Sequence, residues 1–349
     1  MLKIENISLK VGDFELKNIS FNVDAGDYFV ILGVSGVGKS VLLESIAGLI
    51  DISEGNIFLR GRQITEEKIQ NRNISIVYQD TDLFPHLNVF DNIAYPLRSR
   101  KEKEIKDKVL KAASETGISD KLDRNISTLS GGEYQRVSLA RSLAAGNDIF
   151  LLDEPLSSLD PKSKIELRAL LRKLNRAGIT IVHVTHDYEE AVSLANKIGI
   201  MENGTIVHVA PPEQIFQHPK SEFVAKFVGV KNFLRGNVNS IPDSDLKEFL
   251  VDGIKIYVLT DSGDGDSFLL INPEEISLSI TSEGGSARNH FKGKITDIAR
   301  AKMGFEVTVD IGKVELIALL SSESVNSLNL EIGNDIWTNF KASACKIYN

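Results

Sequence analysis

One stretch decides the fold of the first part of this chain: Gly33-Val34-Ser35-Gly36-Val37-Gly38-Lys39-Ser40. It follows an apolar run, Tyr28–Leu32, of the length of a buried parallel strand, and it opens a helix-type segment that continues to about Leu49. A GxxxxGK(S/T) motif between a strand and a helix binds phosphate, because its glycines let the backbone wrap the phosphates while its N–H groups and the helix N-terminus attract them.

This motif assigns roles to individual residues. Lys39 is expected to reach the β- and γ-phosphates of a nucleotide, and the hydroxyl of Ser40 to bind Mg²⁺. The expected phosphate-binding residues are Gly33, Ser35, Gly36, Val37, Gly38, Lys39, Ser40 and Val41.

A second candidate site lies where another apolar run ends in carboxylates. Residues 148–152 form a short strand-type run, and Asp153 and Glu154 follow it. Asp153 is expected to hold Mg²⁺ through its water shell, as a strongly hydrated ion prefers. Phosphoryl transfer needs mainly positioning and charge stabilisation, and these groups can supply both.

The segment Leu129-Ser130-Gly131-Gly132-Glu133 has two compatible interpretations. Ser130 followed three residues later by Glu133 is typical of a capping box at the start of a helix. The start of a helix is also an anion site, so the same residues are suited to contact a phosphate.

Composition limits the class of protein. A length of 349 residues predicts two or three domains, and 42% hydrophobic with 25% charged residues is typical of a globular protein in water. No apolar run is long enough to span a bilayer and no signal segment is recognisable, so we expect any membrane association to come through a partner. A net charge of −8 argues against nucleic acid as a partner. The single cysteine, Cys345, excludes an internal disulfide and a cysteine-built zinc site.

The order of elements predicts an α/β domain followed by an all-β part. Strand-type runs at 148–152, 179–184 and 198–201 alternate with helix-type segments, which predicts a parallel sheet with flanking helices over residues 1–230 and a helical insert at about 80–130. Asn203-Gly204 predicts a hairpin turn. From about Leu234 short alternating runs predict an all-β part over residues 231–349, with a second unit at about 286–349.

The phosphate motif, the LSGG segment and the Asp153-Glu154 pair, in this order and spacing, resemble the ATP-binding subunit of an ABC transporter over about residues 1–230. The resemblance implies a P-loop ATPase of the ABC type that closes ATP between two copies of the subunit. It implies that Glu154 polarises the attacking water, that His186 contacts the γ-phosphate, and that Gln79 touches Mg²⁺ and reports to a transmembrane partner. It further implies that Ser130, Gly131 and Gly132 meet the γ-phosphate of the other copy, and that Asp160 lies in the loop that crosses the dimer interface.

Adenine contact is the point at which the chain departs from that family. The usual aromatic residue falls near Val11 in this register, and the nearest aromatic residue is Phe14. Phe14 is therefore a candidate to stack on adenine, or it is a buried strand residue.

The tail contains Ser286-Ala287-Arg288-Asn289, Phe291-Lys292-Gly293-Lys294 and, near its end, Lys341-Ala342-Ser343. In this order these segments resemble the molybdate-binding Mop domain and the related TOBE-like regulatory β-barrel of importer ATPases, an OB-like fold. Molybdate and tungstate are dianions that only accept hydrogen bonds, so their site needs hydroxyls, N–H groups and cations. The alternative is that the cations are ordinary surface charges, and sulfate has the same charge and shape. The residues implied are Ser286, the N–H of Ala287, Arg288, Lys341 and Ser343.

Together these features predict the ATP-hydrolysing subunit of a molybdate or tungstate importer with an oxyanion-sensing tail. The expected assembly is a homodimer at the cytoplasmic face of the membrane, contacting a permease dimer through the Gln79 loop and the helical insert and served indirectly by an extracytoplasmic binding protein. The alternatives are an importer ATPase for sulfate, iron or sugar, a non-transport ABC ATPase, and an oxyanion store. Only about ninety residues separate Ser40 from Ser130, too few for the long insertion of DNA-repair relatives, and an intact Glu154 disfavours a store.

Overall fold

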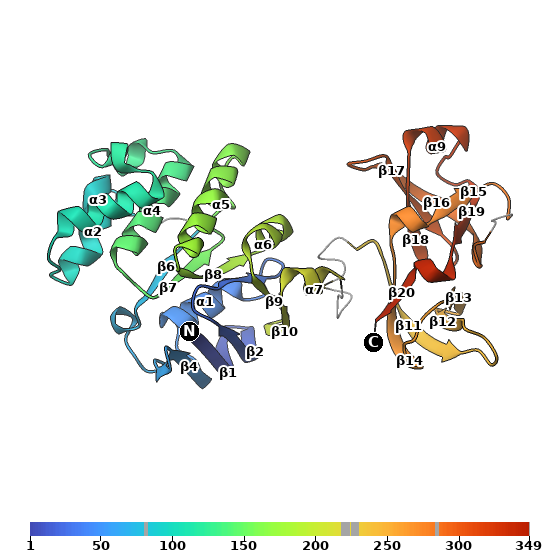
Figure 1. Ribbon diagram of the computed structural model, residues 1–349, viewed down its shortest axis with the longest axis horizontal. Helices are drawn as coiled ribbons and strands as arrows, with labels where there is room; N and C mark the ends of the chain where they lie inside the picture. The colour runs from blue at the N-terminus through green and yellow to red at the C-terminus, as the bar shows by residue number, and fades with distance from the viewer. Residues whose placement is uncertain (80–82, 218–223, 225–229, 283–285, 349) are drawn as a thin grey trace. The chain divides into compact units, whose positions relative to one another are not determined.

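A computed structural model describes residues 1–79, 83–217, 224, 230–282 and 286–348. The chain forms two compact units, Met1–Ile215 and Phe216–Asn349 (Figure 1). The division falls 15 residues before the boundary expected at 230. Within these described residues, no helix has the length and apolar character needed to cross a membrane.

The first unit is built on a six-stranded sheet with the order β10-β9-β3-β8-β7-β6, and β6, β7, β8, β3 and β9 run parallel. The strands are β3 (Tyr28–Leu32), β6 (Ile74–Val77), β7 (Ile149–Asp153), β8 (Thr180–Thr185), β9 (Lys197–Glu202) and β10 (Thr205–Ala210). β3 and β7 are buried throughout, which confirms the prediction from their continuous apolar runs. β10 returns antiparallel to β9 through Asn203-Gly204, whose φ values of 47° and 76° are those of the predicted hairpin turn.

Parallel strands bring their carboxyl ends to one edge of the sheet, where α/β proteins bind ligands. The phosphate motif follows β3, Glu154 follows β7, and His186 follows β8. Because β8 lies between β3 and β7, three segments that are far apart in the sequence meet at this edge.

A second, antiparallel sheet was not predicted from the sequence. Its order is β2-β1-β4-β5, with β1 (Leu2–Val11), β2 (Phe14–Val23), β4 (Glu54–Leu59) and β5 (Arg62–Gln63). Its apolar side chains share one core with β3, β7, β8 and helix α1 (Lys39–Ala47). The remaining helices of the sheet region are α5 (Pro161–Arg176), α6 (Tyr188–Leu194), α7 (Pro212–Gln217) and a 3₁₀ turn at Ile69–Asn71.

The expected helical insert contains α2 (Val89–Ser99) and α3 (Ile105–Thr116), which pack on α4 (Gly131–Ala144). These helices have their own apolar core, distinct from that of the sheets, and Figure 1 shows them gathered to one side of the first unit. Short 3₁₀ turns at Ser119–Lys121 and Ile126–Thr128 lead into α4.

The second unit contains two five-stranded antiparallel sheets with the orders β13-β12-β11-β14-β20 and β15-β19-β16-β17-β18. Their strands are β11 (Asn232–Ser240), β12 (Lys247–Val251), β13 (Ile254–Val258), β14 (Gly265–Ile271), β15 (Ser277–Ser279), β16 (Asn289–Arg300), β17 (Phe305–Asp310), β18 (Glu315–Leu320), β19 (Asp335–Phe340) and β20 (Cys345–Tyr348). Within residues 230–282 and 286–348, the unit also has the helix α9 (Ser322–Ser327) and 3₁₀ turns at Pro273–Glu275 and Ala342–Ala344.

Each of these two sheets contains strands from both sides of position 286, where the second β unit was expected to begin. β20, at the end of the chain, pairs with β14 in the first sheet, and β15, which precedes position 286, pairs with β19 in the second. Apolar side chains of both sheets form one core. The second unit is therefore all-β, as predicted, but its two sheets are not consecutive segments of the chain.

Candidate functional site

The phosphate motif has the backbone geometry that its sequence predicts. Gly38 is the N-cap of α1 with φ of 99° and no side-chain cap, so the first N–H groups of the helix are left for an anion. A Cβ atom at Gly38 would collide with the ring of Phe14, so glycine is required here both for its φ and for the close approach of the ring. Gly36 also has a positive φ, of 85°.

Lys39 lies buried beneath this loop. Its Nζ donates hydrogen bonds of 2.9 Å to the carbonyl oxygens of Gly33 and Val34. Burial lowers the pKa of Lys39, and the neighbouring carboxylates of Glu154 and Asp153 oppose that shift. The ammonium is therefore held by groups that keep it charged inside the site.

Asp153 and Ser40 form the part of the site that suits Mg²⁺. Ser40 Oγ donates to Asp153 Oδ1 at 3.0 Å, which brings a hydroxyl and a carboxylate oxygen together. Burial raises the pKa of Asp153, and the hydrogen bond from Ser40 opposes the rise. No cluster of three or more His, Cys, Asp or Glu side chains suited to a metal occurs in the described part of the chain. The Ser40 hydroxyl and the Asp153 carboxylate supply only a few oxygen ligands, which fits Mg²⁺, because this ion keeps several waters.

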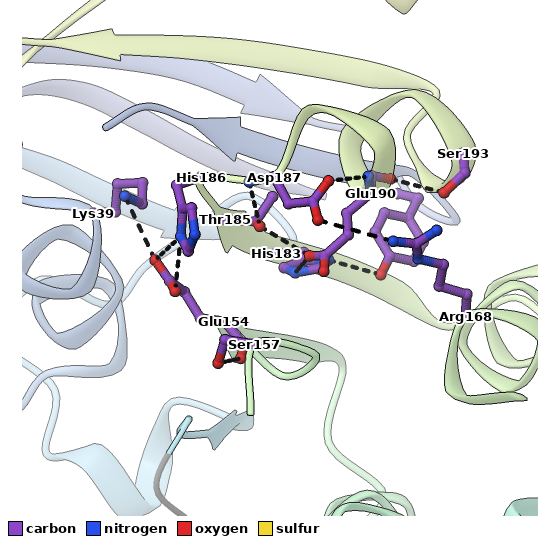
Figure 2. A network of polar contacts seen from close by, with 11 residues as sticks. Lys39, Glu154, Ser157, Arg168, His183, Thr185, His186, Asp187, Glu190 and Ser193 are labelled. Carbon is purple, nitrogen blue, oxygen red and sulfur yellow. Dashed lines mark hydrogen bonds and ion pairs between the residues drawn. The ribbon is translucent and has the colours of Figure 1, made fainter. Parts of the chain in front are cut away.

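Glu154 and His186 lie together across the sheet edge (Figure 2). The Glu154 carboxylate accepts a hydrogen bond from Nδ1 of His186 at 3.0 Å, and its Oε1 lies 3.8 Å from Nζ of Lys39. Glu154 has φ of 43°, an uncommon conformation for a residue with a side chain. Its N–H donates to the carbonyl oxygen of Val184 at 3.0 Å, and Ser157 Oγ donates to its carbonyl oxygen at 2.8 Å. Backbone strain held in place by such bonds is typical of functional residues.

These residues surround one cavity of about 580 Å³. Its lining unites the phosphate motif with Glu154, His186, Gln79 and the aromatic candidate Phe14. The lining residues are Val11, Phe14, Ser35, Gly36, Gly38, Lys39, Ser40, Val41, Gln79, Glu154, Ser157 and His186. Sequence reasoning missed Ser157, although its place three residues after Glu154 in the loop that follows β7 is a usable signal.

The LSGG segment begins α4 and forms the predicted capping box. Ser130 Oγ accepts from the N–H of Glu133 at 3.3 Å, and Glu133 Oε2 accepts from the N–H of Ser130 at 2.9 Å. None of residues 129–133 is among the described residues that line the cavity.

α4 lies close to two segments outside it, the Gln79 loop and the start of α5. Gln135 Nε2 donates to the carbonyl oxygen of Gln79 at 3.4 Å, a contact that sequence reasoning missed. A Cβ at Gly132 would lie 3.0 Å from Oγ of Ser163, whose N–H donates to Asp160 at 3.1 Å. Asp160 is the N-cap of α5, so the LSGG segment and the Asp160 loop are neighbours in one copy.

In the tail, strand register brings together the two predicted oxyanion segments. Asn289 pairs with Phe340 at the end of the β16–β19 ladder, so Arg288 and Lys341 leave that ladder at the same end. Ser286, Arg288, Lys341 and Ser343 are exposed. The carbonyl oxygen of Ala287 accepts from Nε2 of His290 at 2.8 Å, which fixes this turn beside β16.

Comparison with known proteins adds family membership to this geometry. A model of the ABC transporter family matches residues 16–157, and a model of the TOBE domain matches residues 285–347. The chain is 40% identical to the molybdate/tungstate import ATP-binding protein WtpC of Pyrococcus horikoshii, over the full length of both. It is 41% identical to the Fe(3+) ions import ATP-binding protein FbpC of Fusobacterium nucleatum, over 68% of this chain and 65% of that protein.

A solved structure supports the same assignment for the first unit. A dimeric ATP-binding cassette in a post-hydrolysis state with ADP and Pi matches at a TM-score of 0.55 and 29% identity, over 61% of this chain and 99% of that chain. The fold, the two family models and the full-length likeness agree. The chain belongs to the ABC transporter family, as an import ATP-binding protein with ATPase activity and a carboxyl-terminal TOBE domain.

Proposed function

We propose that this chain powers the import of molybdate or tungstate. The observation that carries this proposal is the extent of the likeness. The relative named for molybdate and tungstate matches over the whole chain, tail included, at 40% identity, whereas the relative named for iron covers only 68% of it and a relative named for spermidine and putrescine covers 91% of it at 36% identity. Iron, sulfate, sugar and polyamines remain the alternative cargoes.

ATP hydrolysis is proposed to occur in the cavity at the carboxyl ends of β3, β7 and β8. Glu154 accepts the proton of the attacking water, because its carboxylate faces the same space as Lys39 and His186. His186 lies where it can hold both Glu154 and the γ-phosphate, and Lys39 offsets negative charge on the phosphates. When bound by Ser40, Asp153 and Gln79, Mg²⁺ would neutralise charge on the phosphate oxygens.

The ATPase is proposed to act as a homodimer. Ser130 and Gly132 are the residues expected to meet the γ-phosphate, yet the LSGG segment lies outside the cavity formed by its own phosphate motif. A second copy can supply that segment, and the solved relative with ADP and Pi is dimeric. Asp160 and Ser163, next to Gly132, would then lie at the interface between the copies.

A permease is proposed to dock near Gln79. A cavity of about 260 Å³ lies where β6 meets α2 and α4, with Phe84, Tyr95 and Arg141 in its lining. Phe84 and Tyr95 have ring centroids 4.4 Å apart, and Arg141 lies 5.7 Å from the Phe84 centroid. An aromatic surface with a cation suits a helical segment of a membrane protein. Such a permease would hold this chain at the cytoplasmic face of the membrane. It would receive its anion from an extracytoplasmic binding protein.

The tail is proposed to bind the transported anion and to slow transport when the cell is loaded. Arg288, Lys341, Ser286, Ser343 and the N–H of Ala287 can all donate hydrogen bonds, as a dianion without protons requires. Anion bound there can shift the balance between open and closed ATPase dimers only by its difference in affinity for the two states.

The test of the cargo uses the full-length chain with its permease in proteoliposomes. We expect molybdate or tungstate, supplied with the binding protein, to stimulate ATP hydrolysis and to accumulate inside. Stimulation by ferric iron, sulfate or a sugar alone would contradict the proposal. Titration calorimetry of the full-length chain with molybdate, tungstate and sulfate tests the tail separately.

A further inference from the structure

A chain of buried polar side chains lies behind His186, and no sequence motif predicted it. Tyr28, His183 and Glu190 are 1%, 0% and 2% exposed. The Tyr28 hydroxyl lies 3.0 Å from Nδ1 of His183, whereas Nε2 of His183 makes no hydrogen bond within the described residues and lies 3.6 Å from Oε2 of Glu190. Figure 2 shows His183 and Glu190 directed toward each other between α6 and β8. Polar groups are expensive to bury, so this cluster needs an explanation.

The protonation states follow from burial. Burial lowers the pKa of His183 to about 3, so its ring is neutral and carries one N–H. Burial raises the pKa of Tyr28, so its phenol keeps its proton. With Tyr28 donating to Nδ1, the ring proton lies on Nε2 and faces the Glu190 carboxylate. The opposite tautomer would turn a lone pair toward that carboxylate, which is unfavourable.

Glu190 in turn fixes the two residues that flank His186. Its Oε2 accepts from Thr185 Oγ1 at 2.9 Å, and Thr185 Oγ1 accepts from the N–H of Asp187 at 3.0 Å. Asp187 Oδ1 accepts from the N–H of Glu190 at 3.1 Å, which closes a ring of bonds around the backbone of His186. Arg168, on α5, adds a cation 3.9 Å from Asp187 Oδ2 (Figure 2).

The other end of the chain reaches the strand that carries the phosphate motif. Tyr28 is the first residue of β3, and β3 pairs in parallel with β8, which carries His183. One hydrogen bond, from Tyr28 to His183, and one close approach, of His183 to Glu190, thus lie between the strand before Gly33 and the turn that presents His186. That turn leaves the His186 ring 49% exposed, so its position depends on its backbone and on Glu154.

We propose that Tyr28, His183 and Glu190 are positioning residues that hold the His186 turn so that the imidazole stays on Glu154. The proposal rests on the role proposed above for His186. Hydrogen bonds that served stability alone would affect folding without a specific effect on the hydrolytic step. A positioning role predicts a loss of kcat with unchanged ATP binding. It also predicts that this loss of kcat depends on the presence of His186.

The test is a double-mutant cycle in the full-length chain, with kcat, KM for ATP and thermal unfolding measured for each variant. We expect Glu190→Ala to lower kcat about tenfold with KM within about twofold of wild type, because the bound substrate is held elsewhere. Glu190→Gln keeps an acceptor for Thr185 and should recover most of that loss. Tyr28→Phe should lower kcat about threefold, since it frees the His183 tautomer.

The decisive comparison adds Glu190→Ala to His186→Ala, with residual rates taken from single-turnover reactions. If Glu190 acts through His186, the second change lowers the rate by less than about twofold, because interacting residues are not additive. An undiminished tenfold loss in the His186→Ala background would overturn the positioning role, as would a Glu190→Gln variant that folds but does not recover kcat.

Two controls separate the possible failures. Ser193→Ala, on the same helix, removes only a hydrogen bond to the Glu190 carbonyl oxygen and should leave kcat unchanged. Wild-type kcat in His186→Ala itself would remove the role proposed for His186 and this inference with it. That result is distinct from additivity, which removes the inference alone.

Discussion

The nucleotide site and the tail position their predicted residues in different ways. In the nucleotide site, the predicted residues are in contact at the ends of buried parallel strands. Ser40 contacts Asp153, and Glu154 contacts both His186 and Lys39. In the tail, Arg288 and Lys341 are exposed at the end of a ladder, and no ion pair involves either side chain in the part of the tail that the structure describes. The first arrangement is suited to pre-organised chemistry, where small displacements are costly. The second is suited to a reversible ligand whose binding is tuned by charge.

The largest effect is expected at Glu154. We expect Glu154→Gln to lower kcat by about 10²–10⁴-fold while ATP still binds, because only the proton acceptor is lost. Single-turnover hydrolysis and nucleotide titration measure the two quantities. Glu189→Gln, an exposed change of the same kind on α6, is the matched control and should retain wild-type turnover. Equal rates for Glu154→Gln and the wild type would contradict the role of Glu154.

The close approach of Phe14 to the phosphate motif predicts the next effect. Gly38 and Gly146 have φ of 99° and 65°, but only a Cβ at Gly38 would meet another side chain. We therefore expect Gly38→Ala to lower the free energy of unfolding by at least about 2 kcal/mol more than Gly146→Ala does, since overpacking adds to backbone strain. Denaturant unfolding of the two variants compares them, and equal losses would mean that the ring moves aside.

In the tail the effects should be smaller and sensitive to salt. We expect Arg288→Ala to weaken molybdate binding about tenfold, equivalent to about 1.4 kcal/mol. We also expect the wild type to bind molybdate more weakly at higher ionic strength. Lys313→Ala, an exposed cation in the turn between β17 and β18, serves as the control. Titration calorimetry gives both affinities. Identical affinities for the Arg288→Ala and Lys313→Ala variants would assign the arginine to the ordinary surface.

A small gain of stability is expected from neutralising Asp153. Its pKa is raised by burial, so the folded state binds that proton more tightly, and ionisation above the ordinary pKa of 3.8 costs stability. At pH 7 we expect Asp153→Asn to raise Tm by about 2–4 °C while Mg²⁺-dependent hydrolysis is lost. The gain should shrink as the pH falls toward 3.8. Asp123→Asn, at an exposed position, should change neither quantity, and a lower Tm for Asp153→Asn would contradict the assignment.

Structural features that depend only on a few consecutive residues could be predicted from the sequence. The phosphate motif, the capping box at Ser130 and the hairpin at Asn203-Gly204 each need only a few consecutive residues, and the structure has all three. The β1–β2 pair was missed because register shifts interrupt its alternation, between Ile4 and Ile7 and between Ile7 and Leu9.

Contacts between distant residues could not be predicted in this way. The bond from Tyr28 to His183 joins residues 155 apart, and that from Gln135 to Gln79 joins residues 56 apart. β15 and β20 each pair with a strand of the sheet on the other side of position 286. Which sheet edge each strand joins depends on residues that are far apart in the sequence, so a short stretch of sequence does not predict it. The short motifs of the candidate site therefore do not determine these contacts.

The most direct measurement concerns the proposal that two copies of the chain share each ATP site. Lys39→Ala disables the phosphate motif of one copy, and Ser130→Glu places a negative charge where the LSGG segment should meet the γ-phosphate. Each variant alone should be inactive, whereas a mixture of the two contains dimers with one intact phosphate motif facing one intact LSGG segment. We predict single-turnover ATP hydrolysis in the mixture and none in either variant alone. A mixture as inactive as its components would contradict a site built from two copies.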